Sequence, residues 1–123
     1  MKTIKSTLLA LALVATPALA QDCDQPEAPT MPDGASSTME DMLAGQKAVK
    51  AFQEANIDYL SCVEKAMNAA EAAAKEAGDD DKAAAQQTYA ELVETYNAAV
   101  SIEEEVAGQF NTEIREYKAA NAD

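Results

Sequence analysis

Apolar residues recur at alternating intervals of three and four along two long stretches of this 123-residue chain. In the first stretch, one row repeats every seven residues from Met42 and a second row repeats every seven from Gly45. The rows are Met42, Val49, Asn56, Val63 and Ala70, and Gly45, Phe52, Tyr59, Ala66 and Ala73, with Leu60 and Met67 beside them. Such spacing is typical of the contact face of a coiled coil or helical bundle. It predicts a helix over 38–77, in which Asn56 either sets the register or bonds a neighbour.

The second stretch predicts a helix over 81–120. Its contact face is formed by Ala85, Tyr89, Leu92, Tyr96, Ala99, Val106, Phe110 and Tyr117, with Val93, Val100, Ala107 and Ile114 in a neighbouring row. Glu103 interrupts this face, and we expect it to reach out into solvent with Glu104 and Glu105. Gly108 is expected to mark a kink or a close contact. The tyrosines of both helices are interpreted as core aromatics with hydroxyl groups at the edge.

The segment between the two helices is short and rich in aspartate. Gly78 is expected to end the first helix in a left-handed conformation. One residue of the run Asp79–Asp81 then caps the second helix, and the others lie at its positive end. A linker this short predicts an antiparallel hairpin. Because its alanine-rich faces bury little area, this all-α, coiled-coil-like hairpin needs a further layer, from the N-terminal arm, a second copy or a partner helix.

An N-terminal arm over 21–37 is predicted to be extended. Its segment 23–34 reads CDQPEAPTMPDG, and three prolines fall every third residue, at Pro26, Pro29 and Pro32. That is the period of a polyproline II helix, so the three rings are expected on one face. Asp33-Gly34 then predicts a turn. A hydroxyl residue among 36–38 caps the following helix, and an acidic residue at 40 or 41 is placed for a capping box.

Cys23 and Cys62 are the only cysteines of the chain. In an exported protein an even number favours a disulfide, with two free thiols or an intermolecular bond as alternatives. A helix from residue 38 to Cys62 is about 36 Å long. The extended residues 23–32 span about 28 Å and the turn adds several more, so the arm can fold back and reach Cys62. We therefore predict that the disulfide staples the arm to the hairpin. The alternative is a loose proline-rich tail whose cysteine pairs elsewhere.

Residues 1–20 have the pattern of a secretory signal peptide. Lys2 and Lys5 precede the apolar run Leu8–Ala15, and a small-residue motif predicts cleavage after Ala20. The run is too short for a permanent membrane anchor, which needs about 20 residues, so no stable membrane insertion is expected after cleavage. Cys23 would not be the first residue of the mature protein, which argues against lipid attachment. These features predict a periplasmic location, an arm at 21–37 and a single helical domain over 38–123.

The composition argues against several classes of function. The chain has 9 basic and 22 acidic residues and no histidine. Two of the lysines lie in the leader, so the mature part carries a net charge of −15, which disfavours nucleic acid and anionic lipid as partners. The missing histidine removes the commonest general base and transition-metal ligand. We predict no catalytic, cofactor-binding or metal-binding residues, and expect the protein not to be an enzyme.

Two weak metal signals remain in the sequence. The aspartate run at 79–81 lacks the ligand spacing of a calcium-binding EF-hand loop. Met31, Met39 and Met42 carry thioethers of the kind that bind Cu(I), but Met42 belongs to the contact face and methionine is common in protein cores.

The stretch from Cys23 to Cys62 also resembles a group of small uncharacterised proteobacterial periplasmic proteins. The residues that carry the resemblance are Cys23, Pro26, Pro29, Pro32, Asp33, Gly34, Met42, Lys47, Val49, Phe52, Tyr59, Leu60 and Cys62. The resemblance implies a signal peptide, a periplasmic location and the disulfide, and it implies no activity.

Three functions are compatible with these patterns. The first is a periplasmic interaction or structural module, acting as a homo-oligomer or with a protein partner. The second is a small ATP-independent holdase chaperone, with an apolar groove and a charged rim. The third is a weak copper or calcium binder.

Overall fold

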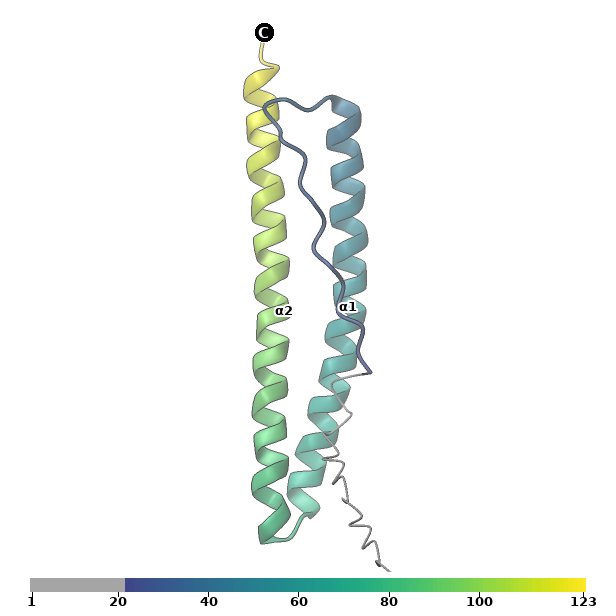
Figure 1. Cartoon of the computed structure of the whole chain (residues 1–123), viewed down its shortest axis with the longest axis vertical. Coiled ribbons are helices and arrows are strands. Elements are labelled where there is room, and N and C mark those ends of the chain that lie inside the picture. The colour runs from purple at the N-terminus through teal and green to yellow at the C-terminus, as the bar shows by residue number, and fades with distance from the viewer. Residues whose placement is uncertain (1–21) are drawn as a thin grey trace, which may run out of the picture.

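The protein is a long antiparallel hairpin of two helices with an extended arm laid along it (Figure 1). This computed structural model describes residues 22–123. Helix α1 covers Met39–Glu76 and helix α2 covers Asp79–Ala120, and no strand occurs within the described residues. The expected signal peptide at 1–20, its cleavage site and the first arm residue, Gln21, lie outside them. The all-helical hairpin predicted from the heptads is confirmed.

A capping box starts α1 at Thr38, the last of the three predicted candidates. The Thr38 hydroxyl accepts a hydrogen bond from the Asp41 backbone N–H at 3.2 Å, and the Asp41 carboxylate accepts one from the Thr38 N–H at 3.0 Å. These paired bonds satisfy donors that the first helical turn leaves free. The bond from the Thr38 backbone, followed by that from its hydroxyl, lowers the pKa of Asp41.

The connection between the helices differs from the prediction. Gly78 has φ −68° and ψ 169°, so it is extended rather than left-handed, and it is the N-cap of α2. Its carbonyl accepts from the N–H groups of Asp81 and Lys82. The aspartates therefore lie in the first turn of α2, where the helix dipole stabilises negative charge, and none is the cap. Two extended residues, Ala77 and Gly78, are enough to reverse the chain.

The hydrophobic core follows the predicted rows of α1. All nine buried α1 residues belong to these rows: Met42, Gly45, Val49, Phe52, Asn56, Tyr59, Val63, Ala66 and Ala70. Ala73 is the only member left exposed. On α2 the buried residues are Leu92, Ala99, Val106 and Phe110, all from the predicted face. Of the tyrosines, Tyr59 is buried, Tyr96 and Tyr117 are half-buried, and Tyr89 is exposed, so its interpretation as a core aromatic was wrong.

Glu103 takes part in the core rather than reaching out into solvent. It is half-buried, and its carboxylate accepts a hydrogen bond of 2.8 Å from the Asn56 side-chain amide. Asn56 also donates to the Ala99 carbonyl at 3.3 Å. Glu103 therefore interrupts the apolar face of α2 because it supplies the hydrogen-bond acceptor that the buried Asn56 amide of α1 needs. The close contact expected at Gly108 is absent, since a Cβ built there meets nothing within 4 Å.

The arm crosses both helices, which the sequence left open (Figure 1). Cys23 and the three arm prolines are half-buried and most residues between them are exposed, which confirms the predicted period of three. Near the turn, Gly34 packs directly on the α2 backbone at Glu113, and its N–H donates to the Glu113 carboxylate at 2.7 Å. Further along, the Pro32 ring lies against Gly45 of α1, where a Cβ would come within 2.9 Å of the ring.

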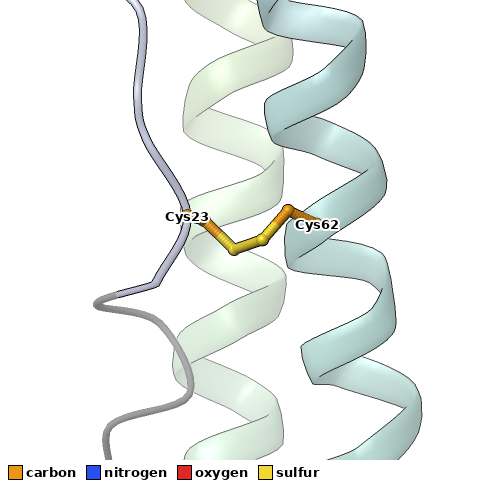
Figure 2. Close-up of a disulfide and its surroundings, with 2 residues drawn as sticks. All are labelled: Cys23 and Cys62. Atoms are coloured by element: carbon orange, nitrogen blue, oxygen red, sulfur yellow. A yellow bond between two sulfur atoms is a disulfide. The ribbon is translucent and has the colours of Figure 1, made fainter.

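A disulfide holds the far end of the arm. Figure 2 shows Cys23 of the arm bonded to Cys62 of α1, with the two Cα atoms 5.7 Å apart. The predicted intramolecular pairing is confirmed. The arm is thus fixed at both ends, by the turn on α2 and by a covalent bond to α1.

Candidate interaction site

The arm covers one side of the hairpin and leaves the other side without a covering layer. On the covered side, Asp41, Ala44 and Ala48 of α1 share a surface hollow with arm residues 30–32. At 3.6 residues per turn, Leu43 and Lys50 lie on the opposite side of α1. No arm residue that the structure describes lines the hollows found there.

Two adjoining grooves mark this side. One, of 270 Å³, lies at the open end of the hairpin and is largely apolar; the next, of 320 Å³, continues toward the middle. Together they are lined by Met39, Met42, Leu43, Gln46, Val49, Lys50, Gln53, Ala107, Phe110, Asn111, Ile114, Tyr117 and Lys118. We call this set the uncovered face.

Large apolar side chains are unusually exposed here. Met39 is 57% exposed and Leu43 is 56% exposed. Ile57, further along the same side of α1, is 60% exposed. Single exposed apolar residues are ordinary, whereas a contiguous group marks an interaction surface. Side chains of this kind suit binding through apolar contact, with amides and lysines supplying polar contacts at the rim.

The uncovered face also lacks negative charge. Residues 22–123 hold all 22 acidic residues of the chain, yet none lines either groove. The only charged side chains there are Lys50 and Lys118. The acidic residues therefore lie outside the two grooves, and a partner can enter them without meeting a carboxylate in their lining.

The sequence pattern predicted one contact face on each helix and did not indicate the uncovered face. The signal was present as a second row on α1 with spacings of four and three: Met39, Leu43, Gln46, Lys50, Gln53, Ile57, Leu60 and Glu64. Four of its eight positions are polar or charged, which concealed the pattern.

One group of carboxylates could hold a hard cation. Oxygens of Asp33, Glu113 and Glu116 lie within 4.8 Å of one another, the only such acidic group in the part of the chain that the structure describes. The negative charge of Glu113 raises the pKa of Glu116, with a hydrogen bond between them and the charge of Asp33 adding to the effect. Calcium takes six to eight oxygen ligands, so three exposed or half-exposed carboxylates form a weak candidate.

The two weak metal signals from the sequence lie in different parts of the fold. Asp79–Asp81 lie in the first turn of α2, at the opposite end of the hairpin from the carboxylate group. Met42 is buried, Met39 is exposed and Met31 packs with the arm against the core around Met42. Met39 and Met42 do share the open-end groove, where they act as apolar lining.

The fold and the site together define a helical hairpin with a disulfide-bonded arm and one apolar face, whose only charged side chains are basic. No family model matches the chain, and neither the curated proteins nor the solved structures include a match. Neither helix is long and apolar enough to cross a membrane, as judged over residues 22–123.

Proposed function

We propose that this protein is an exported, periplasmic interaction module that binds a protein partner through the uncovered face. The observation that carries the proposal is the distribution of apolar groups and charge. The arm shields one side of the hairpin, while Met39 and Leu43 remain exposed on the other side, beside grooves that no acidic residue lines. In a chain with 22 acidic residues, such a face is suited to contact with another protein.

The proposed location rests on two features. The leader at 1–20 has a charged start, an apolar run and a small-residue cleavage motif. The disulfide between Cys23 and Cys62 is stable in an oxidising compartment, as the periplasm is.

Site-specific photo-crosslinking in cells tests the proposed face. A photoreactive amino acid at Leu43 samples the uncovered face, and one at Glu94, which is exposed on α2, serves as the matched control. We expect a discrete crosslinked product from position 43 and none from position 94. Equal crosslinking from both positions, or from neither, would refute the proposal.

A holdase chaperone is the second candidate, because the open-end groove is largely apolar and contains two methionines, Met39 and Met42. Methionine side chains adapt to partners of different shape. This function predicts many crosslinked clients from position 43 and suppression of the aggregation of an unrelated unfolding protein without ATP. A single stoichiometric partner and no such suppression would decide for the interaction module.

A further inference from the structure

The second row of α1 has opposite charges at equal distances on either side of its centre. We call Met39, Leu43, Gln46, Lys50, Gln53, Ile57, Leu60 and Glu64 the outer row. Ile57 is its most exposed apolar residue. Lys50 lies seven residues before Ile57 and Glu64 lies seven residues after it. Seven residues are two helical turns, so all three side chains are on the same side of the helix.

This arrangement is complementary to itself when one copy is reversed. Consider two α1 helices that run antiparallel and cross at Ile57. A residue that lies a given number of positions before Ile57 in one copy then faces the residue the same number of positions after Ile57 in the other copy. Lys50 of one copy then faces Glu64 of the other, and the pair occurs twice because a two-fold interface repeats every contact. The two Ile57 side chains meet at the centre.

We propose that a second copy of this chain docks on the outer row, with the two α1 helices antiparallel about Ile57. The inference deepens the proposed function and rests on it, since it names the partner that contacts this side of the hairpin. The Lys50–Glu64 pairs set the register, as charged flanking positions do in coiled coils.

The charges of the isolated chain leave these pairs free to form. In residues 22–123 the only ion pair is Lys75–Glu71, within α1, and Lys50 and Glu64 are both exposed. Two chains that each carry an excess of 15 negative charges over this part repel one another in general. The outer row itself carries no net charge and adds nothing to that repulsion, because its one acidic residue is matched by one basic residue.

The same register also sets the N-terminal end of the outer row against the C-terminal part of the partner's α1. Residues 39–43 of one copy face residues 71–75 of the other, a segment that reads EAAAK. Met39 then lies opposite Lys75, and Leu43 lies opposite Glu71. The aliphatic stems of these two charged side chains give the exposed Met39 and Leu43 a surface to contact. The overlap runs over residues 39–75, about 55 Å of helix.

Charge reversal tests both the dimer and its register. Lys50→Glu places two like-charge pairs in the interface, as does Glu64→Lys, whereas the double variant restores two opposite-charge pairs. Sedimentation velocity over a concentration series gives the dimer dissociation constant for each protein. We expect each single variant to weaken the dimer by at least about tenfold and the double variant to regain most of the affinity.

Lys82→Glu is the control, because it makes the same change in net charge on α2 and should leave the dissociation constant within a few fold. A second measurement uses Ile57→Cys, which should form an intermolecular disulfide between equivalent positions under mild oxidation. A chain that is monomeric at every concentration would overturn the inference. So would a dimer that neither single variant weakens, or one that the double variant fails to restore.

These results are separable from those that test the proposed function. A monomer that still crosslinks one different protein from position 43 would overturn the self-docking inference and leave the interaction module standing. If position 43 yields no specific product and the chain is monomeric, both proposals fail.

Discussion

Removal of the disulfide should be among the most destabilising small changes in this protein. The bond between Cys23 and Cys62 closes a loop with a sequence separation of 39. In the chain-entropy model, a crosslink of this span restricts the unfolded chain and contributes about 4 kcal/mol at 25 °C. At roughly 4–8 °C per kcal/mol for a domain near this size, the melting temperature should fall by about 15–30 °C.

This magnitude is an upper limit because the arm can also leave the hairpin locally. Without the bond, the arm is held by the half-buried prolines and by the contact of Gly34 with α2. Without the disulfide, a folded hairpin with the arm detached can become more stable than the one with the arm docked. Unfolding then starts from the detached form, and the free energy of unfolding falls by less than about 4 kcal/mol. Exchange of the Gly34 amide proton distinguishes the two cases, since that N–H is bonded to Glu113 only when the turn is docked.

The assay is urea unfolding of Cys23→Ser/Cys62→Ser followed by circular dichroism at the helix band. Each single variant and the chemically reduced wild type are the controls, and all should match the double variant because each lacks the same bond. A loss of unfolding free energy below about 1 kcal/mol, with the Gly34 amide still protected, would refute the stabilisation expected from the crosslink.

Four further substitutions test the packing and the electrostatics. Gly34→Ala should destabilise the protein by about 1–3 kcal/mol, because a Cβ there collides with the α2 backbone. Gly108→Ala, which has open space around it, should stabilise the protein by about 0.8–1 kcal/mol. Urea unfolding measures both changes, and equal effects of the two substitutions would contradict the contact of Gly34 with α2. Asn56→Ala should lower the free energy of unfolding by about 1–3 kcal/mol in the same assay, because it removes both hydrogen bonds to α2. A loss no larger than that caused by the same substitution at an exposed asparagine would contradict the importance of these bonds. Glu116→Gln should raise the melting temperature at neutral pH by removing repulsion from Glu113. Because the folded-state pKa of Glu116 is raised, the wild type regains this stability as the pH falls through that pKa, so melting curves of the two proteins should converge in acid; a difference that persists there would contradict the assignment.

The sequence by itself determined the helical hairpin and the α1 residues of its core. Heptad rows starting at Met42 and Gly45 predicted every buried position of α1, because residues at a 3-4 spacing lie on one face of a helix. The proline period and two cysteines predicted the extended arm and its attachment at Cys62, since chain lengths along the arm and the helix must match.

Only the tertiary structure decided the contacts that depend on two segments at once. The path of the arm over both helices is set by the contact of Gly34 with α2 and of Pro32 with Gly45. No local sequence pattern predicts these two contacts. The partnership of Asn56 with Glu103 depends on the relative register of the helices, so Glu103 looked like part of a solvated run. The uncovered face is likewise defined by where the arm does not lie, because a helix carrying two rows of apolar residues does not indicate which of them its neighbours will cover.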